Sequence, residues 1–238
     1  MSVENNPPVS ESLMPEQSDQ LIASSPEVPV PTPHGLFGMR AWAFADGAEH
    51  ISLRALDNQG QPVPFSARAD SVDEENLYAP VCAPEYIPAV RIHSECATGD
   101  LFGSYRCDCG PQLEQGLSII SRHGGYLLYM RHHEGRGIGL VNKLRAYALQ
   151  DQGLDTVDAN LELGLPAEAR QYSAAARILH ELGAEKIALV SNNPAKQQAL
   201  SELGIDVVTR IPDEIPARAE NARYLDTKRT RMHHLLSL

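Results

Sequence analysis

Hydrophobic and polar positions alternate along this chain with two different periods, and the pattern changes near residue 89. Before it, short apolar runs at 41–44 and 51–56 predict strands, while turn-forming residues dominate 57–88 and predict loops with a short strand. After it, short apolar runs alternate with segments in which apolar residues recur every three to four positions. Such alternation of strands and helices is typical of an α/β fold.

The second half of the chain predicts particular elements. Strands are predicted at 89–93, 126–131, 186–190 and 206–210, and helices at 112–122, 137–152, 173–182, 194–203 and 227–236. Gly124 and Gly183 follow two of these helices as stop signals, and Pro194 suits the first turn of another. We therefore predict a single α/β or α+β domain with a mixed sheet and flanking helices, without internal repeats.

The first 29 residues differ from the remainder in composition. They are rich in Ser, Pro, Glu and Asn, and residues 1–30 hold five acidic residues and no Lys or Arg. Such a segment buries too little apolar surface to fold. We predict a disordered tail at 1–29 and a folded domain at 30–238.

Length, composition and charge narrow the classes of function. With 238 residues, 42% of them hydrophobic and only 5% aromatic, the chain can bury a sizeable aliphatic core. No apolar run reaches the roughly 18 residues of a membrane span, and no signal peptide is recognised, so a cytoplasmic protein without membrane contact is expected. A net charge of −11 argues against long nucleic acid as a partner. Residues 91–147, however, hold seven Lys/Arg against five Asp/Glu, and this local excess suits a small polyanion.

Three of the four cysteines, Cys96, Cys107 and Cys109, lie within fourteen residues, while Cys82 lies apart. Clustered thiols in a reducing compartment indicate a metal rather than a disulfide. Three protein ligands leave one zinc position for water, as in catalytic sites. Zinc lowers the pKa of bound water from 15.7 to about 7, which eases hydroxide formation by roughly 12 kcal/mol. The spacing alone leaves two alternatives open: a structural zinc closed by His93, and no metal.

Longer motifs surround these cysteines, and together they resemble the GTP cyclohydrolase II family of riboflavin biosynthesis over residues 30–238. They are RIHSECATGD (91–100), RCDCGPQLE (106–114), EGRGIGL (134–140), KLRAYALQDQG (143–153), DTVDAN (155–160), SNNPAK (191–196) and YLDTK (224–228). Several motifs in one order are far more specific than a cysteine pattern.

The resemblance implies a role for each matching position. Zinc, one ion per chain, would be held by Cys96, Cys107 and Cys109. Catalysis would involve Tyr147, Glu168 and Arg170. GTP would be contacted by a larger set: Arg91, Ile92, His93, Ser94, Glu95, Gln112, Glu134, Gly135, Arg136, Thr156, Ser191 and Lys196.

The family reaction opens the five-membered ring of guanine at carbon 8, loses that carbon as formate and releases pyrophosphate. The resemblance further implies Mg²⁺ on the triphosphate and a homodimer. Arg136 follows a glycine before a predicted helix, and Lys196 lies just inside another; helix starts suit phosphate, although simple turns explain both positions. Two of the implied GTP contacts also have simpler alternatives: Arg91 could be a surface cation, and Gln112 could cap a helix.

Some positions depart from the family pattern. His132 and His133 replace Arg-Gln, and a metal site there is one alternative. Adjacent strand residues point to opposite faces, however, so we expect one of the two histidines to be structural. Glu168 replaces the aspartate that accepts a proton in the family, two positions before Arg170, the proposed nucleophile toward the α-phosphorus. The extra methylene matters, since a displacement near 1 Å reduces catalysis about 100-fold. An exposed Glu168–Arg170 ion pair is the simpler alternative. Gln171 also departs from an acidic residue.

The resemblance therefore predicts a GTP cyclohydrolase II. The second hypothesis is a diverged relative that stops at a formylated intermediate or uses another purine nucleotide. The third hypothesis is a non-catalytic protein that binds zinc and nucleotide.

Overall fold

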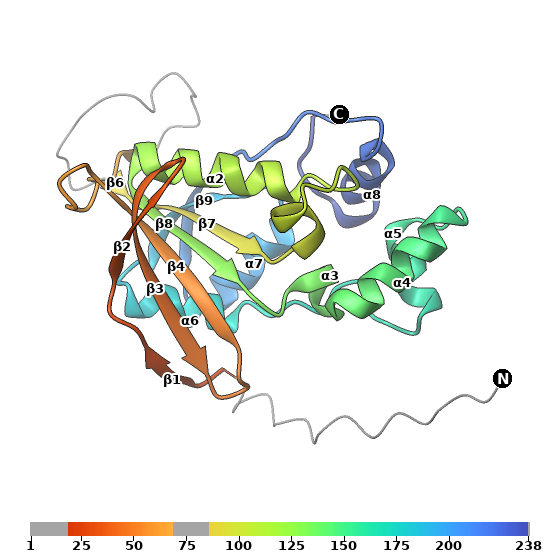
Figure 1. Cartoon of the computed structure of the whole chain (residues 1–238), viewed down its shortest axis with the longest axis horizontal. Coiled ribbons are helices and arrows are strands. Elements are labelled where there is room, and N and C mark those ends of the chain that lie inside the picture. The colour runs from red at the N-terminus through yellow and green to blue at the C-terminus, as the bar shows by residue number, and fades with distance from the viewer. Residues whose placement is uncertain (1–18, 69–85, 238) are drawn as a thin grey trace.

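The computed structural model describes residues 19–68 and 86–237, and Figure 1 shows a twisted sheet with helices on both faces. The strands are β1 (Leu21–Ser24), β2 (Val28–Thr32), β3 (Gly35–Phe44), β4 (Glu49–Leu56), β5 (Ala67–Arg68), β6 (Tyr86–Ile87), β7 (Ala89–Ser94), β8 (Gly125–Met130), β9 (Lys186–Val190) and β10 (Asp206–Ile211). The helices are η2 (Ala97–Leu101, a π-helical turn), α2 (Cys109–His123), α3 (Glu134–Gly137), α4 (Gly139–Asp151), α5 (Thr156–Glu162), α6 (Ser173–Glu181), α7 (Pro194–Glu202) and α8 (Ala222–Met232).

The main sheet is mixed. Within the described residues it has eight strands, in the order β1-β3-β4-β8-β7-β9-β10, with β2 also paired to β3. The strands β1 to β4 are antiparallel to their neighbours, and β4 pairs antiparallel with β8. From β8 onward, each pairing along β7, β9 and β10 is parallel. The predicted α/β class with a mixed sheet is confirmed.

Two hydrophobic layers sandwich the sheet. On one face, Ile119 and Ile120 of α2 pack over Leu127 of β8 and its neighbours. On the other face, α6 and α7 bury Ile178 and Leu200 against the sheet. Because side chains alternate along a strand, neighbouring residues of β7 belong to opposite layers.

The carboxyl ends of the four parallel strands meet at one edge of the molecule. Strands β7, β8, β9 and β10 lead directly into the segments that begin at Glu95, Arg131, Ser191 and Pro212. In open α/β sheets ligands bind outside these ends. Figure 1 places η2, α3, α4, α5 and α8 around this edge, away from β1 and β2.

Most predicted elements are confirmed within a few residues, and β9 matches its prediction of 186–190. Pro194 stands at the first turn of α7, as predicted. The loop region 57–88 contains the short pair β5 and β6, although residues 69–85, including Cys82, lie outside the described residues.

The tail boundary at residue 30 is wrong. Residues 21–24 and 28–32 form β1 and β2, which pair with opposite ends of the same edge of β3, since β4 occupies its other edge. The proline-rich, acidic composition concealed both strands: β2 gains its hydrogen bonds in a hairpin with the start of β3, and β1 gains its own from residues 42–44. Residues 1–18 lie outside the described residues.

The final helix is also displaced. It was predicted at 227–236, but α8 covers Ala222–Met232 and ends at His233, whose backbone is left-handed with φ 55°. The helix α5 was not predicted; Asp155 caps it by accepting from the backbone N–H groups of Val157 and Asp158. In the described part of the chain, no helix has both the length and the apolar composition needed to cross a membrane.

Candidate active site

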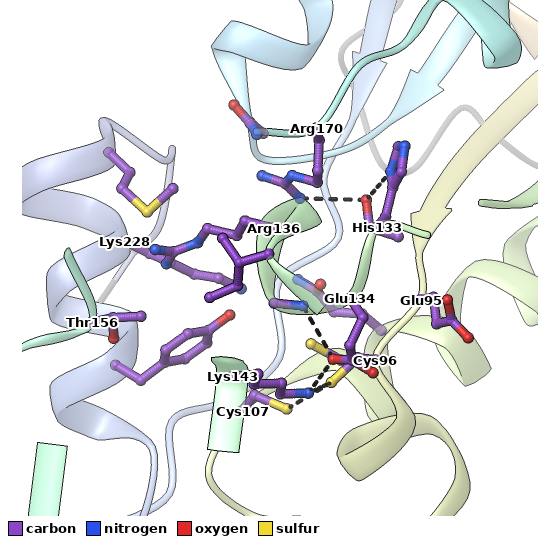
Figure 2. A pocket seen from close by; sticks show the side chains of 18 of the residues that line it. Glu95, Cys96, Cys107, His133, Glu134, Arg136, Lys143, Thr156, Arg170 and Lys228 are labelled. Carbon is purple, nitrogen blue, oxygen red and sulfur yellow. Dashed lines mark hydrogen bonds and ion pairs between the residues drawn. The ribbon is translucent and has the colours of Figure 1, made fainter. Parts of the chain in front are cut away.

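A cavity of about 1020 Å³, counting its part open to solvent, lies at the carboxyl ends of the parallel strands. Of the predicted site residues, all except Ile92 and Glu168 line it. Figure 2 shows Arg136 and Arg170 at one end of this space and the thiols of Cys96 and Cys107 at the other.

The three predicted metal ligands come together. The sulfur atoms of Cys96, Cys107 and Cys109 all lie within 4.8 Å of one another, with 3.7 Å between those of Cys96 and Cys107. Tetrahedral Zn–S bonds of about 2.3 Å place sulfurs roughly 3.8 Å apart, so the spacing fits zinc. Gly99 makes room for them, because a Cβ there would lie 3.0 Å from Sγ of Cys107 and 3.2 Å from Sγ of Cys96.

A buried cation accompanies this thiol cluster. The ammonium group of Lys143 donates to Sγ of Cys96 at 3.1 Å and to the Glu134 carboxylate at 2.5 Å. The other oxygen of Glu134 accepts from the backbone N–H of Ala97 at 2.6 Å. Hydrogen bonds from the Cys107 and Cys109 thiols, with Lys143 nearby, hold the pKa of Cys96 well below its ordinary value. The hydrogen bond with Cys109 lowers the pKa of Cys107, but the bond with Cys96, burial and the charge of Cys96 together raise it to about 11.

His93 does not close the thiol cluster. Its Nε2 lies 3.1 Å from the carboxylate of Asp100, which also accepts from the Tyr129 hydroxyl at 2.8 Å and from the Cys96 backbone N–H at 2.9 Å. Burial lowers the pKa of His93. Among the described residues, no fourth Cys, His, Asp or Glu joins the three cysteines. The alternative of a zinc closed by His93 is therefore wrong.

Arg91 is buried, so the surface-cation alternative is wrong as well. Its guanidinium lies 2.8 Å from Asp213 and donates to the Gln112 side chain at 3.2 Å. Gln112 in turn donates to the backbone oxygen of Asp213 at 3.0 Å rather than capping α2. Between Arg91 and His93, the side chain of Ile92 points into the opposite layer and is fully buried there. Its backbone oxygen accepts from Lys196, which does line the cavity.

The turn after β8 carries Gly135 and Arg136, with left-handed φ values of 61° and 68°. A Cβ on Gly135 would lie 2.9 Å from Ile138, so glycine fits the crowding there. Arg136 lines the cavity with both terminal nitrogens buried, and neither has a hydrogen-bond partner in the described residues. This guanidinium is free to bind an anion in two-pronged fashion.

Arg170 and Glu168 form a pair at the edge of the cavity. Glu168 accepts from Nε of Arg170 at 2.7 Å and also from its terminal NH2 group. Arg170 also donates to the Ser94 hydroxyl at 3.3 Å, and that hydroxyl lies 3.1 Å from Nδ1 of His133 (Figure 2). The side chain of Arg170 is 12% exposed and that of Glu168 is 41% exposed, so only the arginine is largely enclosed.

The two adjacent histidines lie in a turn, since β8 ends at Met130, and the strand assumption is wrong. His132 is exposed, and its backbone N–H donates to Glu95 at 2.9 Å. His133 is buried, and burial with Arg170 and Lys196 nearby lowers its pKa to about 3.

The loop between β9 and α7 supplies Ser191 and Lys196. Asn193 caps α7 by accepting from the N–H groups of Ala195 and Lys196, so these groups already have a partner. The ammonium of Lys196 donates to the backbone oxygen of Ile92 at 2.7 Å. Burial, with Arg91 and Arg170 nearby, holds the pKa of Lys196 well below its ordinary value.

The remaining predicted residues are spread around the cavity. The hydroxyl of Tyr147 lies 3.4 Å from that of Thr98, and the Arg106 guanidinium stacks 4.5 Å from its ring. Thr156 starts α5, and it lies on the same side of the cavity as Lys228 in Figure 2.

Sequence reasoning missed several lining residues. Lys143 and Lys228 lie inside motifs of the resemblance that carry no assigned role, whereas His234 lies in a segment with only a helix prediction. Asp213, which pairs with the cavity residue Arg91, carries no prediction either. Lys228 pairs with Asp108 at 2.6 Å, which links α8 to the cysteine segment.

The model of the family described as GTP cyclohydrolase II matches residues 23–212. This chain belongs to the GTP cyclohydrolase II family. The riboflavin biosynthesis protein RibBA of Nocardia farcinica is 48% identical over 210 residues, covering 87% of this chain and 45% of the relative. RibBA of Mycolicibacterium gilvum is 47% identical over 215 residues, covering 90% and 46%.

This member of the GTP cyclohydrolase II family spans about half the length of these curated relatives. Among solved structures, RibBX, a two-domain 3,4-dihydroxy-2-butanone 4-phosphate synthase from A. baumannii, is similar over 84% of this chain and 42% of its own. A TM-score of 0.38 at 17% identity is too low to carry an argument.

Proposed function

We propose that this chain hydrolyses GTP, opening the imidazole ring at carbon 8 with release of formate and pyrophosphate. The organic product is 2,5-diamino-6-(5-phosphoribosylamino)pyrimidin-4(3H)-one, the first intermediate of riboflavin biosynthesis. One observation carries the proposal: three clustered thiols and a group of enclosed cations line the same cavity. Family membership supports the same reaction.

The charge of the cavity supports a polyanionic substrate. Six cationic side chains line it, against the two carboxylates of Glu95 and Glu134; the cations are Arg91, Arg136, Lys143, Arg170, Lys196 and Lys228. This excess of positive charge is local to the cavity, although the whole chain carries a net charge of −11. A triphosphate with its Mg²⁺ would bind the unpartnered Arg136 and favour the charged form of Lys196.

The thiols of Cys96, Cys107 and Cys109 would hold one zinc ion, as their spacing supports. When bound, zinc supplies a water molecule that loses a proton near neutral pH. Lys143 would keep the Cys96 sulfur anionic, and Glu134 would keep Lys143 in place. The hydroxyl of Tyr147, next to Thr98, would exchange a proton at the opening ring.

Arg170 would act on the α-phosphorus, with Glu168 holding its guanidinium. The two-pronged pair supports a positioning role for Glu168. It also supports a second candidate function: a relative that opens the ring but stops at a formylated intermediate, because Glu168 engages Arg170 from outside the cavity. Glu168→Asp separates the two. We expect it to raise kcat toward complete product in the second case, by up to about 100-fold, and to leave or lower kcat in the first.

The experiment for the first function uses purified, zinc-loaded protein with GTP and Mg²⁺. We expect formate and pyrophosphate in equal amounts and the pyrimidine product by mass spectrometry, all abolished by a zinc chelator and restored by zinc. Absence of formate would refute the function. Tight GTP binding without turnover would instead support a non-catalytic zinc and nucleotide protein. The proposal includes a homodimer in the cytoplasm, which size-exclusion chromatography with light scattering and localisation of a tagged chain would test.

A further inference from the structure

The C-terminal segment returns to the cavity after α8. His233 has a left-handed backbone that ends the helix, and the chain then doubles back. The backbone N–H of His234 donates to the oxygen of Lys228 at 3.0 Å, and that of Leu235 donates to the oxygen of Asn192 at 2.9 Å. These two bonds fix His234 between α8 and the loop that carries Ser191.

His234 faces the cavity with a polar atom that no described residue satisfies. It is one of the lining residues, and its Nε2 is buried with no hydrogen-bond partner among the described residues. A buried polar atom without a partner costs free energy, and native sites that contain one are commonly completed by a ligand or water. The residue lies beyond 23–212, the part matched by the family model.

The surroundings of His234 indicate which ligand would complete it. Burial and four cations, Lys228, Arg170, Lys196 and Arg136, lower its pKa to about 2, so the imidazole is neutral. A neutral imidazole with its proton on Nε2 offers one donor. Phosphate oxygens are acceptors only, and the four cations gather them at this end of the cavity.

We propose that His234 is a binding residue for the polyphosphate chain of the substrate, with its Nε2–H donating to a phosphate oxygen. The identity of the nucleotide rests on the proposed function, whereas the phosphate contact does not. His234 thus adds a neutral donor to a cationic site without adding another charge that the free protein would have to bury.

The test measures binding of inorganic triphosphate and of guanosine by calorimetry, with zinc-loaded protein and without turnover. We expect His234→Ala to weaken triphosphate binding about ten-fold or more and to leave guanosine binding within about two-fold. His234→Gln, which can place an amide N–H near the same position, should recover part of the loss. His233→Ala is the matched control, because that neighbouring histidine is exposed and outside the cavity lining, and it should change neither affinity.

The inference is overturned if His234→Ala binds triphosphate as wild type does, if both ligands weaken equally, or if wild type binds no triphosphate. Should His234→Ala fold poorly, the comparison of His234→Gln with wild type decides alone. A wild type that binds triphosphate through His234 but releases no formate from GTP would refute the proposed function and leave this inference standing.

Discussion

Two ion pairs in this protein have the same length and different surroundings, which allows a matched test of burial. Lys228 and Asp108 are 2.6 Å apart with side chains 9% and 1% exposed. Arg177 and Glu181 on α6 are also 2.6 Å apart, but 54% and 38% exposed. At that distance, the Coulomb energy is about 6 kcal/mol at an effective dielectric constant near 20 and about 1.6 kcal/mol in water.

Removing one member of the buried pair strands the other charge away from water. We expect Lys228→Met or Asp108→Asn to lower the free energy of unfolding by about 3–5 kcal/mol. Glu181→Gln should lower it by no more than about 0.5 kcal/mol. The double variant Asp108→Asn/Lys228→Met strands no charge, so it should lose at least about 2 kcal/mol less than the sum of the single variants.

The assay is urea denaturation followed by fluorescence of Trp42, the single tryptophan of the chain, which is 1% exposed and packed in the core. All variants are measured with excess zinc and again with chelator, because Asp108 lies between Cys107 and Cys109. Lys228→Met leaves the cysteine segment unchanged and controls for metal loss. Single-variant losses no larger than that of Glu181→Gln would refute the reasoning that burial strengthens this pair.

Three further predictions concern the site. Cys107→Ser should lower the amount of bound zinc, measured by elemental analysis, well below that of wild type, and should reduce formate release at least about 100-fold. Zinc retained at the wild-type level would contradict the assignment of ligands. Arg136→Lys should raise KM for GTP about ten-fold, because an ammonium cannot bind phosphate in the two-pronged way of a guanidinium. Its urea midpoint should not change, since the guanidinium has no partner to lose within the described chain, and a fall in stability would contradict this. His133 is neutral when folded, with a pKa near 3, so the stability that it contributes is present above about pH 6.5 and is lost as the pH falls from there toward 3. His133→Gln should therefore remove about 2 kcal/mol of the loss in unfolding free energy between pH 6.5 and 5, and parallel pH profiles for the two proteins would contradict this.

The sequence by itself determined the elements whose signals are local. The apolar run 186–190 and the proline at 194 mark β9 and the start of α7, because these signals act within a few residues. The spacing of Cys96, Cys107 and Cys109 and the long motifs around them were enough to predict the thiol cluster and the family. Alternation along β7 is a local signal too, and it assigns Ile92 to the core layer opposite Arg91.

Only the tertiary structure decided which distant groups meet. The strand β1 forms because the far end of β3, at residues 42–44, offers it a free edge, and the composition of residues 19–32 does not encode that pairing. Lys228 and His234 reach the cavity from the C-terminal part of the chain, over 100 residues from the cysteines that line it as well, and Asp213 from the same part pairs with Arg91. Side-chain contacts of this kind depend on how β10 and α8 pack, and a local pattern carries no information on such packing.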